Sequence, residues 1–157
     1  MNSFRTILHP TDFSRHAEVA LDVARSLTRD LGARLIIVHV APEEGLAHGM
    51  MAVPADPRMY LDLLEGARRR VAGPDLKFQV ETQLWQGNVA EEILRAASES
   101  GCDLIVMGSH GRSGLGRLLL GGVAEAVMHK ADCPVLTVKS ARSGIAPAGH
   151  RSETANI

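Results

Sequence analysis

Residues 103–122 read DLIVMGSHGRSGLGRLLLGG, an apolar run that leads into a glycine-rich stretch. The run Leu104-Ile105-Val106 contains no polar residue, which is typical of a strand covered on both faces of a parallel sheet. Six glycines follow between positions 108 and 122, and a short helix is predicted over Val123–Lys130. A strand that passes through a glycine-rich turn into a helix predicts an α/β fold.

The rest of the chain alternates short apolar segments with amphipathic ones. Ile36-Ile37-Val38 is a second unbroken apolar run. The predicted strands are Thr6–His9, Arg34–Val40, Phe78–Leu84, Asp103–Met107 and Val135–Val138. Between them, helices are predicted over Ala17–Leu31 before Gly32, over Met59–Val71 before Gly73, and from Val89 up to Gly101. Repeated strand–helix–strand units predict right-handed crossovers and a doubly wound parallel sheet.

Local signals set the expected boundaries of these elements. Asn88 and Glu91 have the spacing of a capping box, so the third helix should open there. Gly45–Pro57 is predicted to be a long surface loop beside the second strand. Residues 141–157 are small and polar, and we expect a mobile C-terminal tail that follows one domain over residues 1–140.

The composition is that of one globular domain. A chain of 157 residues can bury a sizeable core, and its 45% hydrophobic and 22% charged residues fit a globular protein. Because aromatic residues make up only 3%, the core must be mainly aliphatic. The net charge of -1 predicts no general attraction to nucleic acid or to an anionic membrane. Any site for an anion must therefore be local.

The chain shows no pattern of secretion or of membrane insertion. No basic region precedes a long apolar stretch near the start, and no apolar run approaches the roughly 20 residues that span a bilayer. Cys102 and Cys133 are the only cysteines, in neither a C-x-x-C pair nor a zinc-ligand pattern. We expect two buried or half-buried thiols in a cytoplasmic protein.

Two segments follow predicted strands and carry suitable chemistry for a ligand. In an open parallel sheet, ligands bind beyond the carboxyl ends of the strands, where the winding direction reverses. Pro10-Thr11-Asp12 follows the first strand, and the glycine-rich stretch 108–122 follows the fourth. Glycine permits positive φ and close approach to a bulky anion, and successive amide N–H groups can then converge on phosphate oxygens.

The electrostatic potential around the glycine-rich stretch favours an anion. No Asp or Glu lies between Leu104 and Ala124, whereas Arg112 and Arg117 do. Gly121-Gly122 precedes the last predicted helix, whose free N–H groups and dipole attract negative charge. The two arginines are equally consistent with a phosphate clamp and with solvated surface positions.

The residues alone leave several alternatives open. A flexible glycine-rich loop without a ligand has the same composition. Asp12 is suited to a ligand contact or to the start of the first helix, and His110 to a ligand contact or to solvent. His9 and His39 lie near adjacent strand ends, but no third metal ligand is evident at a suitable spacing.

Signatures of catalysis are absent from the sequence. It contains no G-x-S-x-G nucleophile elbow, no zinc deaminase set and no phosphate-loop lysine. The glycine-rich stretch is not a dinucleotide-binding fingerprint either, because that motif follows the first strand. We therefore expect a binding protein and not an enzyme.

The arrangement of motifs resembles the universal stress protein family. The glycine pattern G-x-x-G-x9-G is formed here by Gly108, Gly111 and Gly121, between the fourth strand and the last helix. The run 106–111, the residues 133–136 (CPVL) and the opening 9–14 (HPTDFS) are also similar to that family. The order of elements agrees over residues 4–139.

This resemblance implies a five-stranded sheet of order 3-2-1-4-5 with helices on both faces, the adenine nucleotide alpha hydrolase-like fold. It implies a stress-response regulatory protein that binds ATP or another adenine nucleotide, such as AMP or cyclic AMP, with Mg²⁺ as a candidate companion of ATP. At most slow ATP hydrolysis is implied. Carried over by position, the adenine contacts would be Pro10, Asp12 and the backbone near Val40, the ribose and first-phosphate contacts Met107, Gly108, His110 and Gly111, and the outer-phosphate amides Gly121, Gly122, Val123 and Ala124.

The chain departs from the nucleotide-binding members of the family at Gly122. That position is usually Ser or Thr in those members, with a hydroxyl that touches phosphate. A hydrogen bond to a charged group contributes about 1.5–3 kcal/mol, so we expect affinity to fall about ten- to a hundredfold while the amides remain, with glycine as an acceptable N-cap. The alternative is an interaction protein of the same fold with an empty or vestigial nucleotide pocket.

The last predicted strand suggests how the chain assembles. Val135–Val138 is short and apolar, and as an outer strand it would leave backbone groups unpaired. Pairing with the same strand of a second copy would cover both edges by two-fold symmetry. The family resemblance points to the same homodimer, and a further protein partner is expected but not identified.

Overall fold

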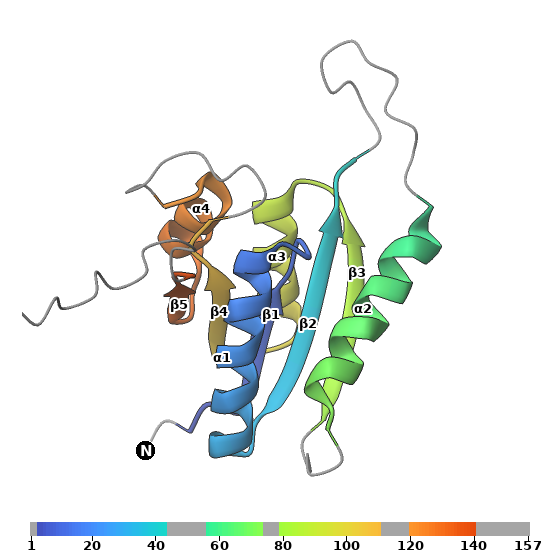
Figure 1. Cartoon of the computed structure of the whole chain (residues 1–157). Coiled ribbons are helices and arrows are strands. Elements are labelled where there is room, and N and C mark those ends of the chain that lie inside the picture. The colour runs from blue at the N-terminus through green and yellow to red at the C-terminus, as the bar shows by residue number, and fades with distance from the viewer. Residues whose placement is uncertain (1–2, 44–55, 74–78, 111–119, 141–157) are drawn as a thin grey trace, which may run out of the picture.

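Strands and helices alternate along the whole folded part of the chain. The computed structural model describes residues 3–43, 56–73, 79–110 and 120–140 (Figure 1). The elements are β1 (Thr6–Pro10), α1 (Arg15–Leu31), β2 (Arg34–Ala41), α2 (Pro57–Val71), β3 (Val80–Gln86), α3 (Val89–Glu99), β4 (Leu104–Gly108), α4 (Gly122–Lys130) and β5 (Val135–Val138).

The five strands form one parallel sheet in the order β3-β2-β1-β4-β5, which confirms the predicted topology. β1 lies at the centre and is buried at all five positions. Its neighbours are β2 on one side and β4 on the other, so the winding reverses between β1 and β4. This reversal is the point at which open α/β sheets bind ligands.

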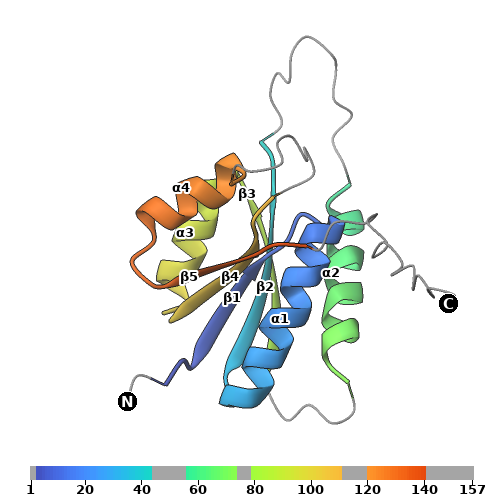
Figure 2. The same ribbon diagram turned by 60° about the vertical axis from the view of Figure 1, so that its left-hand side comes forward.

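Helices cover both faces of the sheet, with α1 and α2 on one face and α3 and α4 on the other (Figure 2). Alternate residues of each strand point to opposite faces. Leu8, Ile36 and Ile105 therefore pack in the cluster under α3 and α4, whereas Ile7, Leu35 and Ile37 pack under α1 and α2. The unbroken apolar runs of the sequence reflect this burial on both faces. Among the described helices, none is both long enough and apolar enough to cross a membrane.

The predicted helix boundaries depend on local hydrogen bonds and largely hold. Ser14 caps α1 by accepting from the Ala17 amide, and Gly32 ends that helix with a φ of 63°. Asn88 Oδ1 accepts from the Glu91 amide at 3.2 Å and opens α3. This helix ends at Glu99, two residues before the predicted end.

Among the boundaries that differ from the predictions, two have a clear physical cause. Pro57 begins α2 and does not end a loop, because Asp56 caps the helix and proline fits the first helical position. β3 continues past Leu84 to Gln86 because Trp85 and Gln86 pair with the last residues of β2. The predicted strand start at Phe78, the rest of the predicted loop and the predicted tail 141–157 lie outside the described residues.

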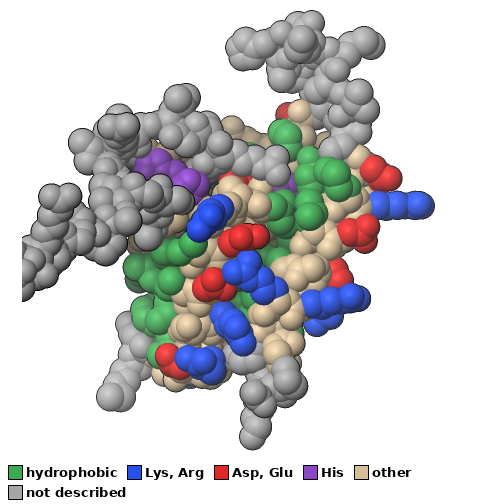
Figure 3. Space-filling view, viewed as in Figure 1, with side chains coloured by type: hydrophobic (Ala, Val, Ile, Leu, Met, Phe, Trp, Pro, Cys, Tyr) green, Lys and Arg blue, Asp and Glu red, His purple; other side chains and the backbone are tan. Residues whose placement is uncertain are grey.

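The outer face of α1 and α2 is a mixed charged surface (Figure 3). Arg70 of α2 lies 3.0 Å from Asp22 and 3.5 Å from Glu18 of α1, and all three side chains are about half exposed. Exposed pairs of this kind contribute little stability, about 0–1 kcal/mol each. With both signs interspersed, this face attracts neither an anion nor a cation strongly.

Both cysteines are half-buried free thiols, as predicted. Burial, and to a lesser extent the neighbouring Cys133, raise the pKa of Cys102 to about 12. The pKa of Cys133 is also raised, again mainly by burial. The reactive form of cysteine is the thiolate, so both side chains are kept in their unreactive form at neutral pH.

We accordingly expect slow alkylation of the folded protein. At pH 8 iodoacetamide should modify Cys102 and Cys133 at least about tenfold more slowly in buffer than in denaturant, as measured by mass spectrometry over time. The unfolded protein is the internal control, because its thiols have ordinary pKa values. Equal rates in the two conditions would contradict the burial of the thiols.

Candidate functional site

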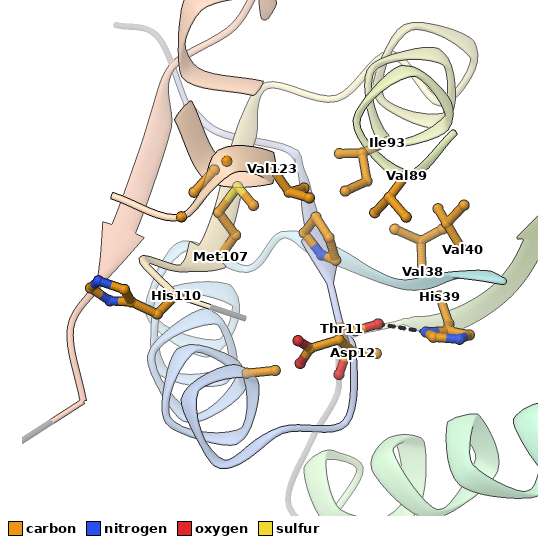
Figure 4. A pocket seen from close by; sticks show the side chains of 16 residues that line it. Thr11, Asp12, Val38, His39, Val40, Val89, Ile93, Met107, His110 and Val123 are labelled. Atoms are coloured by element: carbon orange, nitrogen blue, oxygen red, sulfur yellow. Dashed lines mark hydrogen bonds between the residues drawn. The ribbon is translucent and has the colours of Figure 1, made fainter. Parts of the chain in front are cut away.

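A cavity of about 380 Å³ opens at the carboxyl ends of β1, β2 and β4 (Figure 4). It lies at the reversal of winding, and its volume is within the range of about 300–1,000 Å³ typical of ligand pockets. The turn after β1 and the first turns of α1, α3 and α4 complete its wall. The lining residues are Pro10, Thr11, Asp12, Ala17, Val38, His39, Val40, Val89, Ile93, Met107, Gly108, His110, Gly121, Gly122, Val123 and Ala124.

The residues predicted to contact a nucleotide come together around this cavity. The ten that line it are Pro10, Asp12, Val40, Met107, Gly108, His110, Gly121, Gly122, Val123 and Ala124. The eleventh, Gly111, lies outside the described residues, as do Arg112 and Arg117. The geometry therefore joins the two predicted segments, while the binding role of each residue stays a prediction.

One side of the cavity is an apolar wall, of which the sequence predicted only Val40. Val38 and Val40 point into it from β2, and Val89 and Ile93 from the start of α3 (Figure 4). The place of the β2 residues in the wall could have been predicted, since they lie near the predicted carboxyl end of a strand. The place of the α3 residues could not, because it depends on how α3 packs over β2. Ala17 was not predicted to line the cavity. Thr11 was predicted only as part of the segment Pro10-Thr11-Asp12, and His39 was considered only as a metal ligand.

Asp12 lies in a tight turn between β1 and α1. Its Oδ1 accepts a hydrogen bond from the Ser14 amide at 2.9 Å, and Ser14 in turn caps α1. Asp12 is thus not the N-cap of the helix, although it supports the capping turn. Its half-buried carboxylate lines the cavity and supplies negative charge and hydrogen-bond acceptors there.

The start of α4 forms another side of the cavity. Gly121 is the N-cap, and the predicted N-cap Gly122 is instead the first helical residue. The Gly121 amide donates to the Ser109 carbonyl at 2.7 Å, so within the described structure this amide is used by the protein itself. The prediction that it serves a phosphate is therefore not supported by its hydrogen bonding.

The next three amides of α4 remain suited to an anion. The first helical hydrogen bond runs from Glu125 N to Gly121 O at 2.9 Å, and no side chain in the described part of the chain caps the helix. The N–H groups of Gly122, Val123 and Ala124 come before that bond. Like the first donors of any helix, they have no acceptor within the helix itself. Together with the helix dipole they favour negative charge at this side of the cavity.

Among the described glycines of this stretch, Gly108 is one that close packing requires. A Cβ on Gly108 would lie 3.2 Å from the backbone oxygen of His16 and 3.3 Å from that of His110. Gly108, Gly121 and Gly122 do not use the positive φ that glycine permits: the described glycines with positive φ are Gly32, Gly87 and Gly101. A Cβ on Gly122 would meet no atom within 4 Å.

Histidines lie in and beside the site in different environments. His110 lines the cavity, with Nδ1 3.0 Å from Ser109 Oγ and its ring 5.9 Å from that of His16. His9 is fully buried in β1, where its Nδ1 donates to the Val106 carbonyl at 2.8 Å. Burial lowers the pKa of His9 to about 4, although the hydrogen bond to Val106 and the charge of Asp12 oppose that shift. The described residues include no group of three or more side chains that could hold a metal ion.

Known proteins match this chain over nearly all of its folded part. The universal stress protein family matches residues 3–139. Universal stress protein MJ0577 of Methanocaldococcus jannaschii is 32% identical over an alignment that covers 89% of this chain and 98% of that protein. Its solved structure has a TM-score of 0.69, with 90% of this chain and 99% of that chain covered.

Two more distant solved structures contain nucleotides. A universal stress protein in complex with cAMP has a TM-score of 0.68 at 23% identity, with coverage of 87% of this chain and 98% of that chain. The universal stress protein of Archaeoglobus fulgidus in complex with dAMP has a TM-score of 0.61 at 23% identity, with the same two coverages. These likenesses show a shared fold. The family match and the relative from Methanocaldococcus jannaschii together establish that the chain belongs to the universal stress protein family.

Proposed function

We propose that this chain is a stress-response regulatory protein that binds ATP or another adenine nucleotide in the cavity beside β1 and β4. The observation that carries the proposal is the meeting of an apolar wall and the first turn of α4, whose amides precede the first helical hydrogen bond, in one cavity. A nucleotide has the matching parts, a flat apolar base and an anionic phosphate chain. The complexes of distant relatives with cAMP and dAMP support the same class of ligand.

The base would lie on the β2 and α3 side. There Val40 and Ile93 are buried apolar residues suited to a purine ring, and the Asp12 carboxylate offers acceptors to its amino group. Met107 and Gly108 would then flank the ribose. The phosphates would face the amides of Gly122, Val123 and Ala124, and Mg²⁺ could accompany ATP in solution.

Binding is proposed in preference to turnover. The titratable side chains among the described lining residues are Asp12, His39 and His110, and each already has a hydrogen bond within the protein. In this role, ligand occupancy would alter a surface that a partner protein recognises.

Equilibrium binding tests the proposal directly. ATP, ADP, AMP and cyclic AMP would be titrated into the purified protein by calorimetry and by fluorescence of its one tryptophan. Trp85 pairs with Val40 across β2 and β3, next to the cavity. We expect saturable binding of at least one of these ligands. No saturation at millimolar ligand would favour the alternative of an interaction protein with a vestigial pocket, which the glycine at position 122 suggests.

We also propose that the protein forms a homodimer through β5. This strand is at the edge of the sheet, and Leu136 is 39% exposed on it. Met128 and Val123 of the neighbouring helix α4 are 48% and 39% exposed. An edge strand beside exposed apolar side chains is suited to pairing with a second copy.

A charge on β5 should weaken this dimer. Leu136→Glu places like charges near one another across a two-fold axis, and we expect the dissociation constant to rise about tenfold or more. Sedimentation equilibrium measures the change. Leu61→Glu is the matched control, since Leu61 is 52% exposed on α2, away from β5. A wild-type monomer, or equal effects of the two variants, would refute the β5 interface.

A further inference from the structure

The turn that carries Asp12 is fixed to β2 by its backbone. The Thr11 amide donates to the Val38 carbonyl at 2.8 Å. The Thr11 carbonyl lies 2.7 Å from Nδ1 of His39 (Figure 4). A carbonyl oxygen can only accept, so His39 Nδ1 carries the proton and donates it. The peptide group that leads into Asp12 is therefore held by a side chain of β2.

The next residue in the turn is held in an unfavourable conformation. Phe13 has a φ of 61°, a region that bulky L residues rarely adopt. Its amide donates to Thr11 Oγ1 at 3.0 Å. Strained residues persist only where the surrounding structure determines them, and such residues cluster at ligand sites.

The ring of His39 supports this strained residue. Its centroid is 4.6 Å from that of Phe13 and 4.6 Å from that of Tyr60, with tilts of 41° and 35°. His39 is buried, and Tyr60 belongs to α2 and does not line the cavity. One histidine thus connects α2 with both residues that flank Asp12.

We propose that His39, packed against Phe13 and Tyr60, is a positioning residue that holds Asp12 for the base and thereby sets selectivity for adenine. This inference rests on the proposed nucleotide binding. Adenine carries an amino donor at the position where guanine carries a carbonyl acceptor. A carboxylate fixed at this position therefore accepts a hydrogen bond from the amino group of adenine and repels the carbonyl oxygen of guanine. A mobile carboxylate discriminates less between the two bases.

The first test needs no ligand. In His39→Leu the donor to Thr11 is lost but apolar bulk is kept, and His39→Asn keeps an N–H donor near the position of Nδ1. By NMR hydrogen exchange, the amides of Phe13 and Ser14 should exchange about tenfold faster in His39→Leu, with α3 amides unchanged. His39→Asn should reverse most of this change. Unchanged exchange of both turn amides would overturn the positioning role.

The second test measures selectivity with ATP and GTP, which carry the same phosphates. In His39→Leu we expect ATP binding to weaken about tenfold and GTP binding by less than about threefold, so that the preference for ATP falls. Tyr60→Leu should lower the preference for ATP in the same direction by a smaller amount. It replaces His39→Leu as the test if that variant does not fold. Leu63→Ala, on the same helix and 41% exposed, is the matched control.

The outcomes separate this inference from the proposed function. Equal weakening of ATP and GTP in His39→Leu, or an unchanged ratio, would refute the selectivity role while nucleotide binding stands. A wild type that binds neither nucleotide would refute the proposed function, and selectivity with it. In that case the exchange measurement still decides whether His39 holds the Asp12 turn.

Discussion

Gly122→Ser is expected to tighten ATP binding about ten- to a hundredfold. A hydroxyl at the first position of α4 would add one hydrogen bond to a charged phosphate, worth about 1.5–3 kcal/mol, beside the amides proposed to bind it. The structure has room for it, because a Cβ at this position meets no atom within 4 Å. Calorimetric titration of ATP into both proteins measures the difference.

Two control variants isolate the hydroxyl. Gly122→Ala makes α4 stiffer without adding a donor, so it should change affinity much less than serine does. Gly66→Ser places the same side chain in α2, where a Cβ also meets no atom within 4 Å, and should leave binding unchanged. If alanine and serine at position 122 gave equal affinities, direct contact of the hydroxyl with phosphate would be wrong.

Acid is expected to destabilise the folded protein through His9. The pKa of His9 is about 4 in the fold, below its ordinary 6.5, mainly because burial disfavours the charged ring. Between these two values the unfolded chain binds more protons than the folded one, so the free energy of unfolding falls as pH falls through this window. The contribution of this one group is about 3 kcal/mol over the whole window, and it levels off below pH 4.

Urea unfolding at several pH values between 7 and 4 measures this effect. His9→Asn keeps an N–H donor near Val106 but does not titrate. The difference in unfolding free energy between wild type and variant at each pH therefore gives the contribution of His9 without that of the carboxylates. His129→Gln is the matched control, because His129 is 76% exposed on α4. Parallel pH profiles for wild type and His9→Asn would show that His9 is not held neutral.

The buried His9 also connects the core with the proposed site. It precedes Pro10 in β1, and its hydrogen bond to Val106 joins β1 and β4, two of the three strands whose carboxyl ends form the cavity. Protonation keeps this bond, because the charged ring retains its Nδ1–H, but it places an unfavourable buried charge between β1 and β4. We therefore expect acid to affect ligand binding and stability together.

Element boundaries were predictable where a local hydrogen bond or a backbone conformation sets them. Gly32 ends α1 and Asn88 opens α3 through contacts within a few residues of the chain. Pro57 was misplaced in a loop although its signal was present, since proline after Asp56 is a helix start. The end of β3 at Gln86 also had a local signal, Gly87 with a φ of 144°, although pairing with β2 is what extends the strand to that point.

Apolar periodicity and the positions of glycine and proline are enough to define five parallel strands, their helices and the two segments at the carboxyl ends of β1 and β4. These features follow from contacts between near neighbours and from burial of both sheet faces. Tertiary packing alone decided that α3 supplies an apolar wall, that the Gly121 amide bonds to Ser109, and that His39 reaches the Asp12 turn. Each of these joins elements distant in sequence, so it depends on how helices settle on the sheet.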